Sequence, residues 1–180
     1  MKNKMTQMIV EGGIVIALAK ILSLITLFKM PLGGSVTLCS RLPLIIFAIR
    51  WGAKSAFPIC AIYGLVDMLI GGYIIHPMQA ILDYILSYGA MCLSGLNNQK
   101  KDLKDHIAFI ILAYIVSGLF NIISGYIFFK DMTTALEAGF KNFITYDIIY
   151  NYSFLLADML ILLIIFAISY KRLKALIFRK

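Results

Sequence analysis

An acidic residue, Asp83, lies inside the segment 77–92, which otherwise has the character of a membrane-spanning helix. An ionised carboxylate in hydrocarbon costs about 2.5–3.5 kcal/mol, so such a group faces a cavity or a partner rather than lipid. Within a cavity the carboxylate would attract a positively charged ligand. Asp83 therefore predicts a site for a small, cationic molecule.

A second polar and aromatic cluster is spaced at one helical turn. Asn121, Gly125 and Phe129 follow one another at i, i+4 and i+8 and therefore share one helix face. This face offers an amide, then a gap without a side chain, then a ring, so a planar ligand could lie over the glycine and stack on the ring. Close helix–helix contact at Gly125 explains the spacing equally well, because small residues favour close approach in membranes.

A third cluster opens the last apolar segment. Tyr146 and Tyr150 are one turn apart, and Asn151 follows the second tyrosine. Tyrosines also collect at membrane interfaces without binding anything, but such an interface requires no buried amide. Stacking of a cation on these rings could add about 0.5–2 kcal/mol. Together the three clusters predict a flat, nitrogen-rich organic cation as ligand.

The composition indicates the scaffold that must position these residues. Of 180 residues, 61% are hydrophobic and 14% are charged. Soluble domains average about 45–50% apolar and about 25% charged residues, so the chain is an integral membrane protein. We expect an all-α membrane protein with a single domain, a bundle of six transmembrane helices. The expected spans are 8–28, 36–50, 53–73, 77–96, 107–129 and 143–170.

The distribution of positive charge predicts the orientation of these spans. Of the 17 Lys and Arg residues, twelve fall on one side of the membrane and three, Lys29, Lys130 and Lys141, on the other. Because positive residues favour the cytoplasm, both termini are expected there. The net charge of +8 sits at the ends of the segments rather than along one face, which argues against nucleic acid as a partner.

Further charged residues lie within the expected spans. Glu11 and Lys20 fall in the first span, whereas Arg41 and Asp67 fall in the second and third at depths that a long arginine could bridge. We predict an Arg41–Asp67 ion pair; the alternatives are that Arg41 extends to the interface or lines the cavity.

Small residues in the first span predict a helix–helix contact. Gly13 and Ala17 are separated by three residues, a spacing that lets another helix approach closely. The partner helix could belong to this chain or to another protein.

Motifs of common chemistry are missing from the sequence. It holds no phosphate-binding loop, no zinc-protease motif and no nucleophile elbow. Cys39, Cys60 and Cys92 are far apart and indicate reduced, packed residues rather than metal ligands. We therefore expect no enzyme activity, no metal and no cofactor.

Several strings along the chain resemble one known family. They are MPLGGSV at 30–36, LP at 42–43 with FAIRWG at 47–52, HPMQAILDY at 76–84 and SGYIFF at 124–129. In this order they are similar to the thiamine-specific S components of energy-coupling factor (ECF) transporters. The resemblance runs along essentially the whole chain.

The resemblance implies a function and partners. Such a subunit has six helices in the prokaryotic plasma membrane and captures thiamine from outside. It then associates with a shared transmembrane subunit and two cytoplasmic ATPase subunits that drive uptake. Gly13 and Ala17 match the residues that pack against the shared subunit.

The resemblance also implies a set of ligand contacts. Asp83 matches a carboxylate that faces the thiazolium ring, and Tyr84 lies beside it. The other matched ligand positions are Gly34, Asn121, Gly125, Phe129, Tyr146 and Asn151. Asn121 stands where a histidine is expected and Phe129 where tryptophan is common, so a related pyrimidine or thiazole compound stays open as the ligand.

Other functions remain as alternatives at this point. One is an S component for another vitamin or a thiamine precursor. Another is a small intramembrane enzyme that uses Asp83, Asp147 or Asp158 as acid or base, although no paired groups are evident. A third is an assembly subunit without a ligand, in which Asp83 and Asn151 would tolerate apolar replacement.

Overall fold

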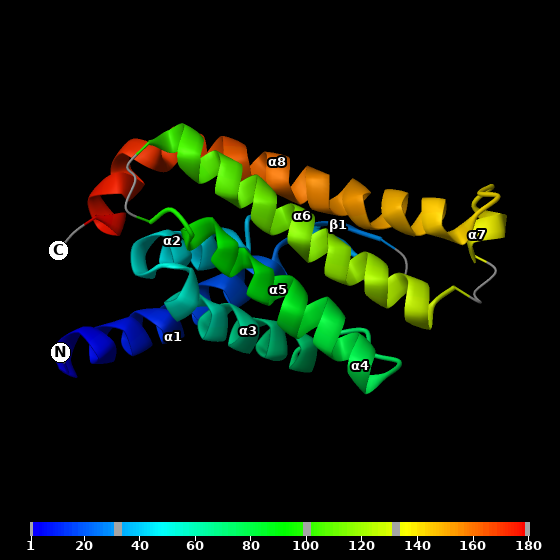
Figure 1. The fold of residues 1–180 in the computed structure, drawn as a ribbon, viewed down its shortest axis with the longest axis horizontal. Coiled ribbons are helices and arrows are strands. Elements are labelled where there is room, and N and C mark those ends of the chain that lie inside the picture. The colour runs from blue at the N-terminus through cyan, green and yellow to red at the C-terminus, as the bar shows by residue number, and fades with distance from the viewer. Residues whose placement is uncertain (1, 31–33, 99–101, 131–133, 179–180) are drawn as a thin grey trace.

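The computed structural model describes residues 2–30, 34–98, 102–130 and 134–178, and it is mostly helical (Figure 1). Among the described residues, three helices are long and apolar enough to cross a membrane: α1 (Lys2–Leu24), α6 (Leu103–Phe128) and α8 (Phe143–Ile177). A span needs about 20 apolar residues, which each of these helices provides. α6 and α8 pack along one another.

Two shorter helices, α2 (Leu42–Trp51) and α3 (Ala53–Leu69), follow one another directly. Gly52 joins them with a backbone φ of 83°, a left-handed conformation that favours glycine and permits the abrupt change of direction. α2 lies at the centre of the molecule, since Leu44 and Ile45 are completely buried.

The segment that carries Asp83 is one helical run of changing type. It consists of α4 (Pro77–Ala80), the π-helical turn η2 (Ile81–Leu86), α5 (Ser87–Gly89) and the 3-10 helix η3 (Ala90–Gly95). The π turn holds Asp83; π turns are rare and frequently occur at functional sites. Gly64 of α3 packs directly on the backbone of Tyr84, so α3 and this run cross closely.

A small antiparallel hairpin follows α1 and was not expected from the sequence. Its strands are β1 (Thr26–Lys29) and β2 (Ser35–Thr37), with Phe28 opposite Val36. α1 therefore ends at Leu24, four residues before the expected end of the first span. A turn with Cys39 at φ 57° separates β2 from α2, so helix begins at Leu42 rather than at the expected start of the second span.

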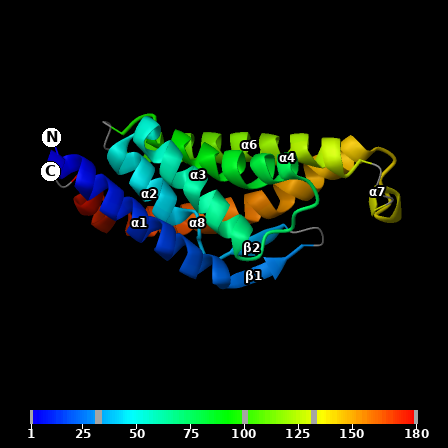
Figure 2. The ribbon, with the colours of Figure 1, turned by 90° about the horizontal axis from the view of Figure 1, so that it is seen from below.

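The two ends of the described chain lie at one end of the helix bundle, and the hairpin lies at the other. The start of α1 and the end of α8 lie together at one end (Figure 1). The hairpin lies beyond the other end of α1, and β2 contacts α8 (Figure 2). The short helix α7 (Thr134–Glu137) is found at this end too. The starts of α4 and α8 and the ends of α3 and α6 lie toward this same end of the bundle (Figures 1 and 2).

The outward faces of the helices are apolar. Exposed side chains include Leu69 at 76% and Ile168 at 80% of their accessible surface. Such a surface would be unfavourable in water and suits contact with lipid. Cys39, Cys60 and Cys92 are buried and free, in agreement with packed residues.

Candidate ligand-binding site

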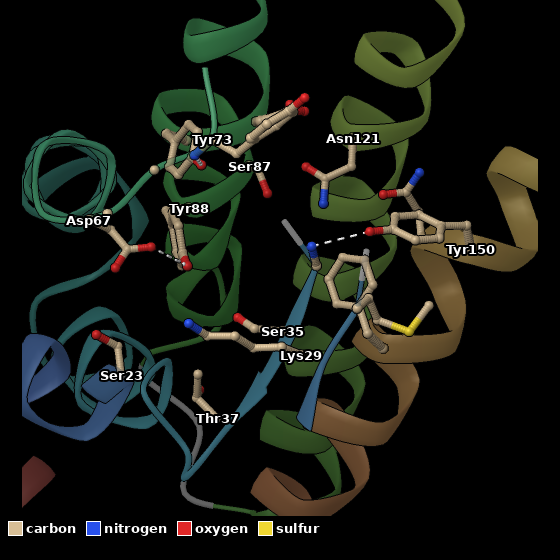
Figure 3. A pocket seen from close by; sticks show the side chains of 18 of the residues that line it. Ser23, Lys29, Ser35, Thr37, Asp67, Tyr73, Ser87, Tyr88, Asn121 and Tyr150 are labelled. Carbon is tan, nitrogen blue, oxygen red and sulfur yellow. Dashed lines mark hydrogen bonds between the residues drawn. The ribbon is translucent and has the colours of Figure 1, made fainter. Parts of the chain in front are cut away.

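A cavity of about 390 Å³ lies at the hairpin end of the bundle, within the usual volume range of small-molecule sites. The structure brings all eight of the ligand residues expected from the sequence to its walls. They are Gly34, Asp83, Tyr84, Asn121, Gly125, Phe129, Tyr146 and Asn151. Asn121 from α6 and Tyr150 from α8 both point into this space (Figure 3). The ligand contacts themselves stay a prediction.

A buried glutamine holds the side chain of Asp83. Gln79 lies one turn earlier and donates from Nε2 to Oδ2 of Asp83 over 2.7 Å. Gln79 is only 2% exposed, so the donor is held firmly by its surroundings, while Asp83 is half-buried. This hydrogen bond fixes the carboxylate in the cavity wall without neutralising its charge, which stays available to a cation.

The same glutamine secures the chain that precedes α4. Gln79 Nε2 also donates to the carbonyl oxygen of Tyr73 (3.0 Å), and Gln79 Oε1 accepts from the backbone N–H of Ile75 (3.1 Å). The hydroxyl of Tyr84 accepts from the backbone N–H of Tyr73 over 2.8 Å. The site was predicted without Gln79, although this residue stands in the string 76–84 that supported the family resemblance.

Asp147 is a second carboxylate of the wall and was not among the predicted ligand residues. It is 4% exposed, and its Oδ1 accepts from Nδ2 of Asn151 over 2.8 Å. The carboxylate rests on Gly125 so closely that a Cβ there would collide with both of its oxygens. Gly125 therefore makes room for Asp147, a contact between α6 and α8 that spacing alone did not indicate. Asp83 and Asp147 both line the cavity.

Aromatic side chains line the α8 side of the cavity. The rings of Tyr146 and Tyr150 have centroids 5.8 Å apart, and those of Tyr150 and Phe154 are 5.9 Å apart. The backbone N–H of Gly34 donates to the hydroxyl of Tyr150 over 3.2 Å (Figure 3). A Cβ at Gly34 would lie 2.9 Å from the Phe154 ring, so the hairpin rests directly on these aromatic residues.

On the opposite side, Phe129 is 9% exposed and stacks against Tyr73. The two ring centroids are 6.4 Å apart and the ring planes are inclined by 29°. The end of α6 is thus joined to the segment that Gln79 holds. Aromatic rings and the two carboxylates thus line the same cavity.

The predicted Arg41–Asp67 pair is wrong. Arg41 donates from Nη1 to Oδ2 of Asp158 over 2.8 Å, whereas Asp67 pairs with Lys20 over 2.7 Å. Helical depth in the membrane was a poor guide because it does not fix which way a residue faces around the axis. Arg41 precedes α2 and faces α8, while Asp67 faces α1. Arg41 does line the cavity, which was one of the two alternatives to the pair.

Asp158 also anchors the hairpin. Its Oδ2 accepts from the hydroxyl of Tyr114 over 2.7 Å, and its Oδ1 accepts from both the backbone N–H and the hydroxyl of Thr37 over 3.3 Å. The guanidinium of Arg41 lies over the rings of Tyr88 and Tyr114, 5.1 and 5.3 Å from their centroids. This buried network joins β2 to α6 and α8. Two of its residues, Thr37 and Arg41, line the cavity.

The arrangement favours binding of a cation over catalysis. Asp83 and Asp147 carry no cationic partner in the part of the chain that the structure describes, whereas Asp67 and Asp158 are each paired. The described residues contain no group of three or more His, Cys, Asp or Glu that could hold a metal ion. Two carboxylates that lack a cationic partner among the described residues, in a cavity that aromatic rings also line, suit a flat organic cation.

Three comparisons with known proteins all find thiamine transporters. The sequence model of the family described as "Thiamine transporter protein" matches residues 9–178. The chain is 26% identical to the thiamine transporter ThiT of Bacillus subtilis (strain 168), and the match covers 97% of each protein. A solved structure of ThiT from Listeria monocytogenes superposes with a TM-score of 0.79 at 26% identity and covers 95% of this chain and 98% of that chain.

Proposed function

The chain belongs to the thiamine transporter family, and from this premise we propose that it captures thiamine outside the cell as the S component of an ECF transporter. Members of this family are transporters and not enzymes, and the helical, apolar chain is a membrane protein.

The pair of carboxylates in the cavity is the observation that carries the proposal. Asp83 and Asp147 come from different helices, and both line the cavity. Two like charges in a water-poor site repel each other, and a bound cation relieves that repulsion. Thiamine supplies a permanent positive charge on its thiazolium ring, which a neutral vitamin does not.

The shape of thiamine also agrees with the walls. It has two flat rings joined by one carbon atom, and the cavity is bounded by rings of α8 and by Phe129. In the proposed complex the thiazolium faces Asp83 beside Tyr84, and the pyrimidine lies toward α6 and α8. Gly34, Asn121, Gly125, Tyr146 and Asn151 complete the contacts.

The proposed topology is a multi-pass plasma membrane protein with six spans and both termini in the cytoplasm. The distribution of Lys and Arg supports this orientation. It turns the cavity, whose lining includes residues of the hairpin at the end opposite the termini, toward the exterior. α2 has only ten residues, fewer than a membrane span requires. In the proposed topology, the hairpin strand β2 extends this second span toward the outer side.

The proposed contact with the shared transmembrane subunit is the face of α1 that carries Gly13 and Ala17. Both residues are exposed, and a Cβ built at Gly13 meets nothing within 4 Å. A helix of another protein could approach this face closely. Two cytoplasmic ATPase subunits would then supply the energy for uptake, since this sequence has no nucleotide-binding motif.

Calorimetry on the purified full chain tests the proposal. Wild type should bind thiamine saturably at one site, and Asp83→Asn should weaken binding by about 100-fold or more, as expected for loss of a charge in a buried site. Asp102→Asn makes the same chemical change at an exposed position and should bind as wild type does. Absence of thiamine binding by folded wild type, or full affinity in Asp83→Asn, would contradict the proposal.

A further inference from the structure

Two hydrogen-bond acceptors in the cavity wall have no donor. Oδ2 of Asp147 and Oδ1 of Asn121 are both shielded from solvent, and neither has a hydrogen-bond partner among the described residues. Asp147 as a whole is 4% exposed, and its other oxygen is already bonded to Asn151. Buried acceptors without donors are rare in folded proteins, so these two atoms require an explanation.

The two acceptors belong to one patch of the wall. Asp147 rests on Gly125, and Asn121 lies one turn before Gly125 on the same face of α6. Both side chains line the cavity. The missing donor is therefore one that a ligand brings into the cavity.

We propose that Asp147, together with Asn121, binds the exocyclic amino group of the ligand's pyrimidine and selects amino-substituted over oxo-substituted pyrimidines. This inference rests on the proposed function. An aromatic amino group has two hydrogens, one for each unpartnered oxygen. A carbonyl oxygen at the same place would instead face two acceptors, one of them charged. Asp147 is thus a specificity-determining residue, distinct from Asp83, which faces the thiazolium.

A purely structural role for Asp147 predicts a different behaviour. Its carboxylate already accepts from Asn151 and packs on Gly125, so it could serve only to join α6 and α8. In that case its replacement would weaken all ligands equally. The ratio of affinities for two ligands that differ only in the amino group separates the two roles, because loss of folding or packing does not change that ratio.

The experiment measures binding of thiamine and of oxythiamine, in which a carbonyl oxygen replaces the amino group, to the purified full chain. Wild type should prefer thiamine by about tenfold or more, as a buried charged acceptor can supply. In Asp147→Asn the new amide can donate to the carbonyl, so the preference should fall below about threefold or reverse. The matched control Asp102→Asn should keep the wild-type ratio.

Each result decides the inference. An unchanged ratio in Asp147→Asn, or loss of both ligands by the folded variant, overturns it; loss of thiamine with retention of oxythiamine supports it. If Asp147→Asn does not fold, Asn121→Ala carries the test, with a reduced ratio expected and an unchanged ratio overturning the inference. Wild type that binds neither ligand contradicts the proposed function, whereas equal binding of both contradicts only this inference.

Discussion

Removal of the Asp158 carboxylate should destabilise the protein strongly. Arg41 and Asp158 are 6% and 1% exposed, so Asp158→Asn leaves a buried guanidinium without its counter-charge. Loss of one partner from a buried pair costs about 3–5 kcal/mol. At about 2–4 °C per kcal/mol for a chain of this size, the melting temperature should fall by roughly 6–20 °C.

The Lys20–Asp67 pair provides the matched comparison. Its side chains are 15% and 18% exposed, so water can reach the charge that Asp67→Asn leaves behind. The contribution of such a pair is closer to that of a surface ion pair, about 1 kcal/mol or less, or roughly 2–4 °C. The two variants make the same chemical change in ion pairs of nearly equal length, but Asp158 is more deeply buried and accepts three further hydrogen bonds against one at Asp67.

The melting of the purified chain can be followed with a dye that fluoresces on reaction with thiols. Cys39, Cys60 and Cys92 are buried and free, so they become reactive only as the structure opens. The double variant Arg41→Met, Asp158→Leu removes both charges and should recover most of the loss. The reasoning is refuted if Asp158→Asn melts within about 3 °C of wild type, or if the double variant melts below Asp158→Asn.

Three further outcomes test other parts of the account. Gly125→Ala should lower thiamine affinity by about tenfold or more, measured by calorimetry, because its Cβ displaces the Asp147 carboxylate. Gln79→Met should weaken thiamine binding and reduce thermal stability by about 1–3 kcal/mol, since it removes three hydrogen bonds of a buried side chain; unchanged melting and binding would contradict this role. Ala17→Leu should abolish co-purification with the partner subunits and thiamine uptake by cells while calorimetry shows normal binding; retained co-purification would exclude this face as the contact.

The sequence predicts well where the long helices lie and which of the singled-out residues line the cavity. Long apolar stretches can hardly fold otherwise in lipid, where backbone groups must be paired internally. Asn121, Gly125 and Phe129 share a face by helical spacing alone, and Asp83 is conspicuous because a charge in hydrocarbon is costly. Such signals depend only on local sequence and solvent, so they can be read without the fold.

Features that depend on contacts between distant segments were not predicted. Residues 26–28 continue the apolar run of the helix before them, and the Pro and Gly residues that follow predict a turn without indicating strand pairing, so the sequence did not indicate the hairpin. Arg41 could reach several acidic residues, and only the packing of α2 against α8 selects Asp158. The contact of Asp147 with Gly125 likewise depends on how α6 and α8 are rotated about their axes, which spacing within each helix does not determine.

A structure of the full chain solved with bound thiamine tests the central claim most directly. The account predicts the ligand inside the cavity, with the thiazolium about 4–6 Å from the Asp83 carboxylate, a separation at which opposite charges attract strongly. The pyrimidine should lie against α6 and α8. Thiamine bound outside the cavity, or an Asp83 side chain directed into lipid, would contradict the account.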